Sequence, residues 1–540
     1  MPAYDYQLLL KHLLHQGVSW APEQEIVYRD QVRYCYRDFY QRVLRLGSAL
    51  RSLGVVPGTR VGVLEWDSHR YLEMYFGIPG IGAVMHTANP GLAFEDLLYT
   101  ICHAGDEIII AHADFAPLVE RLRPALHQVR KFVLINDGPF RPAYAWVDAY
   151  YEDLLEEAAP LAELPDLDED SLATLSYTTG TTGRPKGVYF TQRQITLQTL
   201  SDCVALSALG SYGGVNKHDV YMPLTPMFHG HAWGMPYVAT MLGIKQVFPG
   251  KYEVPILLRL IAREKVTFSH CVPTILHKIL ASPAAQETDF NHCRIIIGGA
   301  ALSKSLAGEA AQRGIQVYGG YGLSETCPVL TIANLKPFME AWESEEQLDW
   351  LVKPGFTLPL VYLKVIDASG QEVPQDGQAV GEVVVRTPWC TPSYYQEEAT
   401  AEELWRGGWL HTGDLAAIDQ YGYIRLVDRL KDVIKSGGEW IVSQDVERLL
   451  AQHEDVQEAA VIGVPDPEWG ERPLAIVVLR QEAVGRLNDA QLKEHLGRYV
   501  MRGELAAWAV PQGYVYVDEI PKTGVGKYNK RLLRSRYAGV

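Results

Sequence analysis

The sequence predicts an α/β protein with a large N-terminal body and a small C-terminal α+β domain. Before about residue 355, short apolar runs alternate with stretches of helical spacing. Such βα alternation is typical of largely parallel sheets that are covered by helices on both faces. Beyond that residue, alternating strands are separated by turns, and a second α+β pattern starts near residue 431. The length of 540 residues exceeds the usual ~100–200 residues of one domain, which also favours several domains.

The N-terminal body takes its strands from two sets of apolar runs. The first set lies at 60–65, 82–86, 107–111, 131–136 and 172–177, with helices predicted at 69–77 and 94–103. The second set lies at 219–224, 245–248, 265–270, 294–299 and 315–320. The runs are short and bounded by turn residues, as expected of buried strands. We therefore predict two mostly parallel sheets flanked by helices.

The remaining elements predict a small antiparallel β-subdomain and a separate C-terminal unit. Runs at 361–367, 382–386 and 423–427 read as antiparallel strands. Helix, strand, strand and helix patterns follow at 447–453, 458–464, 474–479 and 491–496. The predicted domains are residues 1–430 and residues 431–540, and the second has an ordinary domain size.

Composition excludes several classes of protein. The formal net charge of −16 argues against a nucleic-acid groove, which needs clustered Lys and Arg. The seven cysteines are widely spaced and form no C-x-x-C, which argues against disulfides or zinc and suits a reducing compartment. No apolar run reaches about 18 residues, so no membrane span is expected. A cytoplasmic protein is expected, and peripheral membrane contact stays open.

The stretch S-Y-T-T-G-T-T-G-R-P-K-G-V at 176–188 predicts a phosphate-binding loop. Glycines allow close approach of the backbone to an anion, and convergent N–H groups can bind it. Hydroxyl groups and one ammonium group add further donors. The donors are Thr178, Thr179, Gly180, Thr181, Thr182 and Lys186. The stretch departs from the P-loop pattern, because Lys186 is followed by glycine. The alternative is a Gly/Thr-rich surface loop.

A second motif is Gly319-Gly320-Tyr321-Gly322-Leu323-Ser324-Glu325-Thr326. Glycines on both sides free the backbone around an aromatic ring that could stack on a base, and Glu325 offers an oxygen ligand for Mg²⁺. The alternative is a glycine turn with a core tyrosine. This segment and the segments 226–233 and 298–301 each follow a predicted strand. Open α/β sheets bind ligands at the carboxyl ends of their strands.

Three further segments carry candidate polar groups. Asp414, in W-L-H-T-G-D-L, could accept protons from two ribose hydroxyls, although a solvated turn aspartate is the plainer alternative. Lys527, between Gly526 and Tyr528, offers a compact cation or belongs to a solvated basic tail. In P-M-F-H-G-H-A-W-G, His229 and His231 lack the further ligands of a metal site, and the role of His231 stays open.

These motifs occur in the order of the ANL adenylate-forming superfamily, which the chain resembles over nearly its whole length. The 176–188 stretch resembles [YF]-T-S-G-T-T-G-x-P-K-G, 321–325 resembles Y-G-x-T-E, 412–414 matches T-G-D, and 521–527 resembles P-x-T-x-x-G-K. Two differences are conservative, since Thr179 and Ser324 keep a hydroxyl. Among these families the chain is most similar to bacterial fatty acyl-CoA synthetases.

The resemblance implies a role for each residue. It implies that Tyr321 stacks on adenine, and that Gly299, Ala300, Gly320, Gly322, Ser324 and the threonine loop line the nucleotide site. Asp414 and Arg429 would contact the ribose, and Thr181 and Glu325 would hold Mg²⁺. Lys527 would be the adenylation lysine, Lys431 the hinge of a mobile C-terminal domain, Lys435 a further nucleotide contact, and Gly437 and Gly438 the turn facing coenzyme A. His229 would lie near the acyl carboxylate, and Trp233 would gate an acyl tunnel.

The expected activity is therefore an AMP-forming acyl-CoA ligase that uses ATP, Mg²⁺ and coenzyme A. No acid lies in 230–236, which argues against an amino acid, and a medium- or long-chain fatty acid fits best. Ligases for aryl or other small acids, and a catalytically silent nucleotide-binding regulator, are the alternatives. A dinucleotide oxidoreductase fits less well, because no G-x-G-x-x-G follows a strand. The resemblance also suggests a homodimer.

Overall fold

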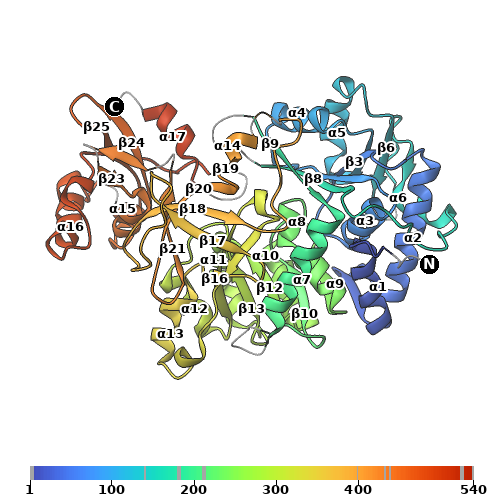
Figure 1. Cartoon of the computed structure of the whole chain (residues 1–540), viewed down its shortest axis with the longest axis horizontal. Coiled ribbons are helices and arrows are strands. Elements are labelled where there is room, and N and C mark those ends of the chain that lie inside the picture. The colour runs from blue at the N-terminus through green and yellow to red at the C-terminus, as the bar shows by residue number, and fades with distance from the viewer. Residues whose placement is uncertain are drawn as a thin grey trace. The chain divides into compact units, whose positions relative to one another are not determined.

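The computed structural model describes residues 5–138, 141–178, 184–208, 214–397, 399, 401–430, 433–436, 439–483, 485–522 and 528–537. Over these residues the chain forms two compact units. The first holds the residues up to Thr178, residues 184–362 and residues 386–410. The second holds residues 363–385 and the chain from His411 onward. Figure 1 gives the element labels.

The first unit contains a seven-stranded sheet in the order β7-β6-β5-β3-β4-β8-β9. Its strands are β3 (Arg60–Leu64), β4 (Val84–Thr87), β5 (Ile108–His112), β6 (Lys131–Ile135), β7 (Ala149–Tyr150), β8 (Leu172–Thr178) and β9 (Lys186–Thr191). All neighbours are parallel except β9, which runs antiparallel to β8. Its helices are α2 (Tyr36–Ser52), α3 (His69–Gly80), α4 (Phe94–Ala104), α5 (Ala116–Leu122) and α6 (Tyr151–Glu157).

A nine-stranded sheet in the same unit has the order β16-β15-β14-β13-β12-β10-β11-β1-β2. Its strands are β1 (Glu25–Tyr28), β2 (Val32–Cys35), β10 (Val220–Pro223), β11 (Lys245–Phe248), β12 (Phe268–Cys271), β13 (Arg294–Ile297), β14 (Gln316–Gly322), β15 (Val329–Ile332) and β16 (Phe356–Thr357). Its centre is parallel, and β2, β15 and β16 are antiparallel. The helices that accompany it are α1 (Leu10–Trp20), α7 (Gln192–Ala208), α8 (Gly230–Trp233), α9 (Met235–Met241), α10 (Val254–Glu264), α11 (Pro273–Leu280), α12 (Lys304–Gln312) and α13 (Ser344–Leu351).

The central strands of this sheet are buried on both faces. In β13, Ile295 and Ile297 pack into the apolar cluster that includes α10, α11 and α12. Ile296 packs into another cluster, with residues of α7 and α9 and with Trp233. Successive strand residues point to opposite faces, so a continuous apolar run is what two covered faces require.

The second unit is built mainly from antiparallel strands. One sheet contains β17 (Tyr362–Ile366), β18 (Gly381–Arg386), β20 (Trp409–Ile418) and β21 (Ile424–Arg429). The other has the order β23-β22-β25-β24, with β26 beside β25. Its elements are β22 (Ile434–Ser436), β23 (Glu439–Ile441), α15 (Ser443–Leu450), β24 (Val456–Asp466), β25 (Gly470–Leu479), α16 (Asp489–Met501), β26 (Gly513–Tyr516) and α17 (Lys530–Tyr537). The short elements α14 (Ala401–Leu404) and β19 (Trp405–Arg406) belong to the first unit.

The predicted fold class is confirmed, with three corrections in detail. Residues 25–35 form β1 and β2, which the sequence did not predict, and β1 joins the sheet beside β11. The predicted loop at 176–188 begins and ends within a β-hairpin, since Thr178 pairs with Lys186. Residues 319–322 do not follow a strand but belong to β14, which pairs antiparallel with β15 from Gly320 onward.

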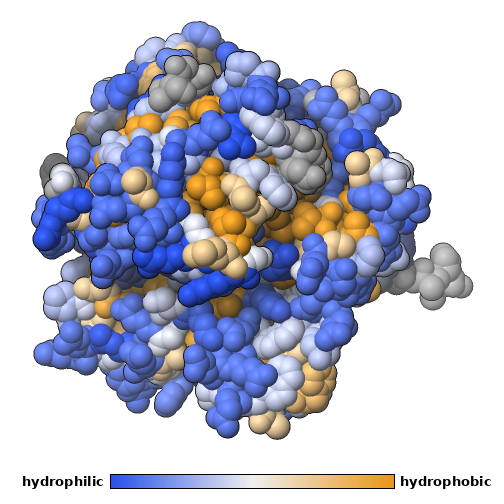
Figure 2. All heavy atoms as spheres, turned by 90° about the vertical axis from the view of Figure 1, so that its left-hand side faces the viewer, coloured by the Kyte–Doolittle hydropathy of each residue, from blue (hydrophilic) through white to orange (hydrophobic). Residues whose placement is uncertain are grey.

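Two expectations from composition agree with the structure. All seven cysteines are free. Among the described residues, no helix is both long and apolar enough to cross a membrane. The face drawn in Figure 2 is mostly hydrophilic, with apolar side chains gathered near its centre. The exposed large apolar residues of the second unit include Trp469, Met501 and Trp508.

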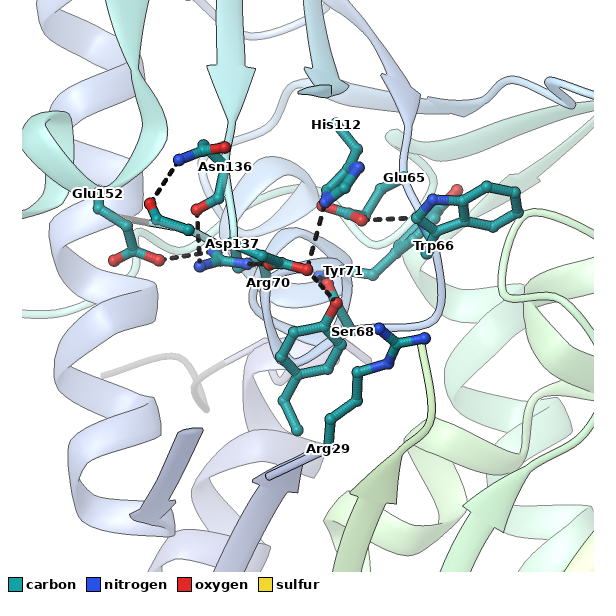
Figure 3. A network of polar contacts seen from close by, with 12 residues as sticks. Arg29, Glu65, Trp66, Ser68, Arg70, Tyr71, His112, Asn136, Asp137 and Glu152 are labelled. Atoms are coloured by element: carbon teal, nitrogen blue, oxygen red, sulfur yellow. Dashed lines mark hydrogen bonds and ion pairs between the residues drawn. The ribbon is translucent and has the colours of Figure 1, made fainter. Parts of the chain in front are cut away.

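A buried polar network lies at the carboxyl ends of β3, β5 and β6 (Figure 3). Arg70 donates to Asp137 over 2.7 Å and to Glu152 over 2.6 Å, and His112 lies 3.4 Å from Asp137. Glu65 is fully buried, and desolvation raises the pKa of its carboxyl to about 7. Desolvation thus acts on Glu65 more strongly than the nearby His112 and Arg70 cations do.

Glu65→Gln is expected to stabilise the protein at alkaline pH. A carboxyl whose pKa is raised on folding stabilises the native state while protonated, and this contribution is lost as pH rises from about 4.5 through about 7. The glutamine cannot ionise, so the variant should gain about 3 kcal/mol at pH 8 and little at pH 5. Urea unfolding at both pH values measures this. Glu152→Gln is the control and should lower the free energy of unfolding at pH 8, because two arginines lower the pKa of Glu152. Equal stability of wild type and Glu65→Gln at pH 8 would contradict the assignment.

Gly17→Ala is expected to destabilise the protein although alanine favours helices. A Cβ at Gly17, in α1, would lie 1.9 Å from the carbonyl oxygen of Thr240, so α1 would have to move away from α9. We expect a loss of about 2–3 kcal/mol in the free energy of unfolding. The matched control is Gly308→Ala in α12, where no atom lies within 4 Å of an added Cβ. That variant should gain about 0.5–1 kcal/mol.

Candidate functional site

Tyr394 links two of the predicted site residues. The Lys186 ammonium lies 4.5 Å from the centroid of the Tyr394 ring. The Tyr394 hydroxyl donates to Glu325 Oε1 over 2.8 Å. The structure therefore places Lys186, at the end of the threonine-rich stretch, close to Glu325. Thr178 lies on the paired strand opposite Lys186, while Thr179, Gly180, Thr181 and Thr182 lie outside the described residues.

Close backbone contact shapes the segment from Gly320 to Glu325. A Cβ at Gly322 would lie 1.9 Å from the carbonyl oxygen of Pro328, so no side chain fits there. Tyr321, between the two glycines, is only 7% exposed. Ser324 and Glu325 follow in a short 3-10 turn (Ser324–Thr326). The backbone NH of Thr391 also donates to the Glu325 carbonyl over 2.9 Å. The segment is thus fixed by its backbone, which leaves the half-buried side chains of Ser324 and Glu325 at the surface of the unit.

Trp233 packs against the glycines after β13. A Cβ at Gly298 would lie 3.0 Å from the Trp233 ring and 3.3 Å from the Gly320 carbonyl oxygen. The Trp233 ring also lies 5.0 Å from that of His270. Gly299, with φ = 75°, and Ala300 follow and are exposed. The predicted acyl gate and the predicted wall of the adenine site are therefore neighbours.

His229 leads into a left-handed turn. Residues from Gly230 to Gly234 all have positive φ, with φ/ψ of 53°/40° at His231 and 47°/45° at Ala232. Each non-glycine residue in this region costs about 1–2 kcal/mol, so the surrounding contacts must hold the turn. His231 is buried, and burial together with His229 lowers its pKa to about 4. His231 is therefore a neutral side chain on the protein side of the turn.

In the second unit, Asp414 and Arg429 pair with each other. They are cross-strand partners in β20 and β21, and Arg429 Nε lies 3.1 Å from Asp414 Oδ1. Asp414 is 7% exposed, and its backbone NH bonds to the Thr412 hydroxyl. This cross-strand pair joins a guanidinium and a carboxylate in a charge-assisted contact.

The remaining predicted site residues lie at the start and the end of the C-terminal segment. Lys435 is exposed on β22, and its backbone NH donates to Glu471 over 3.0 Å. Lys431, Gly437, Gly438 and Lys527 lie outside the described residues. The roles predicted for these four residues stay predictions.

Tyr394 was not predicted from the sequence. Its segment packs along β9, where the Tyr395 NH donates to the Gly187 carbonyl over 2.8 Å. The tyrosine pair in T-P-S-Y-Y carries no sequence signal for a partner 69 residues away at Glu325. Only the folded chain shows this contact.

Residues 15–395 match the AMP-binding enzyme family, and residues 445–527 match the AMP-binding enzyme C-terminal domain. The chain belongs to the AMP-binding enzymes. This is the ANL adenylate-forming family that the motifs resemble, so that prediction is confirmed.

Similar proteins include several CoA ligases. A long-chain-fatty-acid–CoA ligase of Thermus thermophilus is 40% identical over 99% of this chain and 96% of its own length. A 3-methylmercaptopropionyl-CoA ligase of Ruegeria pomeroyi is 38% identical over 92% of this chain and 90% of its own. An anthranilate CoA ligase, solved with anthranoyl-AMP, is 25% identical with a TM-score of 0.83 and covers 99% of both chains. This AMP-binding enzyme is thus an AMP-forming acyl-CoA ligase, with an acid, ATP and CoA as its substrates.

Tyr394→Phe is expected to slow formation of the acyl-adenylate. The variant keeps the ring beside Lys186 but loses the hydrogen bond to Glu325, and a bond to a charged group contributes about 1.5–3 kcal/mol. We expect a loss of about tenfold or more in kcat/KM for pyrophosphate release. Tyr395→Phe is the matched control, since its ring packs beside Tyr189. A Tyr394→Phe enzyme as fast as Tyr395→Phe would show that the Glu325 contact is dispensable.

Proposed function

We propose that this enzyme is a medium- or long-chain fatty acyl-CoA synthetase. The supporting observation is a cavity of about 50 Å³ on the α7 face of the nine-stranded sheet, lined mainly by apolar residues together with Arg294, Tyr318 and Asn334. Its lining includes Leu206, Phe268, Ile296 and Ile332. These residues belong to or pack against the same apolar cluster as Trp233. Each CH₂ of an acyl chain buried there would contribute about 0.8 kcal/mol.

The nucleotide end of the site would use the predicted residues. Lys186 and the threonine loop would bind phosphate oxygens, Tyr321 would stack on adenine beside Gly299, Ala300, Gly320 and Gly322, and Ser324 would contact the α-phosphate. Asp414 and Arg429 would bind the ribose, with Lys435 as a further contact. His229 would face the acyl carboxylate, and Trp233 would gate its chain. These groups act by positioning and charge compensation, which is what transfer at phosphorus requires.

The half-buried Glu325 carboxylate fits a Mg²⁺ ligand, because the hydrogen bond that one of its oxygens accepts from Tyr394 comes from a neutral hydroxyl. Thr181 is the other proposed ligand. Bound Mg²⁺ would neutralise phosphate charge. The proposed division into residues 1–430 and 431–540, with a hinge at Lys431, would let Gly437 and Gly438 face CoA in the second half-reaction. The homodimer and the cytoplasmic location stay predictions.

The substrate is tested by pyrophosphate release with a series of acids. Saturated acids from hexanoate to palmitate should give kcat/KM values that rise with chain length, whereas benzoate and anthranilate should be poor substrates. Formation of the CoA thioester from the same acids checks the second half-reaction. Higher kcat/KM with the aryl acids would show that the substrate is an aryl acid and not a fatty acid. Tight ATP binding without pyrophosphate release for any acid would favour the silent regulator.

Lys527→Ala is expected to abolish most adenylation. A lysine between the incoming carboxylate and the α-phosphate would relieve repulsion in the transition state, and loss of one such donor typically costs about 10²–10³-fold in kcat. Acyl-AMP formation in a single turnover measures this step. The control is Lys522→Ala, which removes an exposed ion pair with Glu458 at 2.6 Å and a cation–π contact with Tyr528. Native acyl-AMP formation by Lys527→Ala would reject the proposed role.

A further inference from the structure

Helix α7 carries an unusual set of buried side chains. Nine of its residues are buried, and six of these are polar: Gln192, Thr196, Gln198, Thr199, Ser201 and Asp202. Buried polar groups normally have hydrogen-bond partners, and some of these do, as the Thr199 hydroxyl donates to the Ile195 carbonyl over 2.8 Å. Thr196, Gln198 and Asp202 each have a side-chain oxygen without a partner among the described residues, and the last two contact each other.

Gln198 and Asp202 form a pair with two unused oxygens. Both are 0% exposed. The Gln198 amide NH₂ donates to Asp202 Oδ2. Gln198 Oε1 and Asp202 Oδ1 have no hydrogen-bond partner among the described residues. Desolvation raises the pKa of Asp202 well above its ordinary value, which favours a neutral carboxyl. An unmade hydrogen bond at a buried polar atom is destabilising, so a ligand that made both would bind favourably.

The pair lies on α7 between the Trp233 turn and the two α7 residues that line the cavity. A Cβ at Gly234, the residue after Trp233, would lie 2.6 Å from Gln198 Oε1. Asp202 follows Gln198 by one helical turn, and Ala205 and Leu206, one turn further, line the apolar cavity. One face of α7 therefore runs from the Trp233 turn, past the two polar side chains, to the cavity.

We propose that Gln198 and Asp202 form a polar subsite in the acyl pocket that binds the hydroxyl group of a hydroxy fatty acid. This inference rests on the proposed fatty acyl-CoA synthetase activity and narrows its substrate. A hydroxyl both donates and accepts hydrogen bonds. It can therefore donate to Gln198 Oε1 and accept a hydrogen bond from the protonated Asp202 carboxyl. A plain methylene would leave both oxygens unsatisfied. An ammonium group would require Asp202 to be ionised. Among the described residues, no cation offsets the desolvation of the Asp202 carboxylate.

The test compares octanoate with hydroxyoctanoates that carry the hydroxyl at successive carbons. The variant Gln198→Met/Asp202→Leu replaces both polar side chains by apolar ones of similar size. Thr199→Val is the matched control, since it removes a buried hydroxyl of the same helix that already has its partner. kcat/KM for pyrophosphate release and the melting temperature are measured for all three proteins.

We expect wild type and Thr199→Val to prefer one hydroxyoctanoate over octanoate. The double variant should lower that preference by about tenfold and keep or raise both its octanoate activity and its melting temperature. If all three proteins turn over octanoate and show the same preference between hydroxyoctanoates and octanoate, the subsite is wrong but the proposed function stands. A wild-type preference for an aminooctanoate would overturn the hydroxyl assignment. No turnover of octanoate or of any longer acid would overturn the proposed function as well.

Discussion

The close approach of backbone segments around β14 is the constraint on which the site depends. Added Cβ atoms would lie 2.1 Å from the Lys353 carbonyl oxygen at Gly319 and 1.9 Å from that of Pro328 at Gly322. Glycine is therefore required sterically at both positions, and the chain between them has little freedom. Tyr321 is held between these contacts, and Glu325 follows three residues later. A side chain fixed by its backbone needs less ordering when a ligand binds, which is how a rigid scaffold pre-organises a site.

The sequence predicted the elements of the fold better than their partners. Apolar runs located β3 to β6 and β10 to β13, because strands covered on both faces need continuous apolar side chains. The same rule could not find β1, whose parallel partner β11 lies more than 200 residues away: Val27 pairs with Val247. Motifs located Glu325 and Lys186, but their contact through Tyr394 depends on chain segments that meet only after folding. Local pattern identifies residue types, whereas long-range pairing is a property of the packed chain.

Tyr394 keeps two opposite charges near each other without neutralising either. Its ring face lies beside the Lys186 ammonium, and its hydroxyl donates to the Glu325 carboxylate. A cation–π contact is weaker than a buried ion pair, so the ammonium keeps much of its capacity to bind an anion. A carboxylate that accepts one neutral hydrogen bond likewise keeps free lone pairs for a cation. In the proposed site, phosphates and a metal ion would use these two charges, whereas a direct Lys–Glu pair would have occupied both.

The turn after His229 concentrates backbone strain beside a helix with buried polar atoms that lack hydrogen-bond partners among the described residues. His231, Ala232 and Trp233 have left-handed backbone conformations in succession. Pro328 packs against Gly230 at the start of the turn, and Gln198 packs against Gly234 at its end. Such strain costs several kcal/mol, against a typical total stability of about 5–15 kcal/mol. The similar proteins are named for different acyl groups, such as a long-chain fatty acid and 3-methylmercaptopropionyl. Under the proposed function, a strained turn beside an incompletely bonded helix is where a few substitutions would change which acid is accepted.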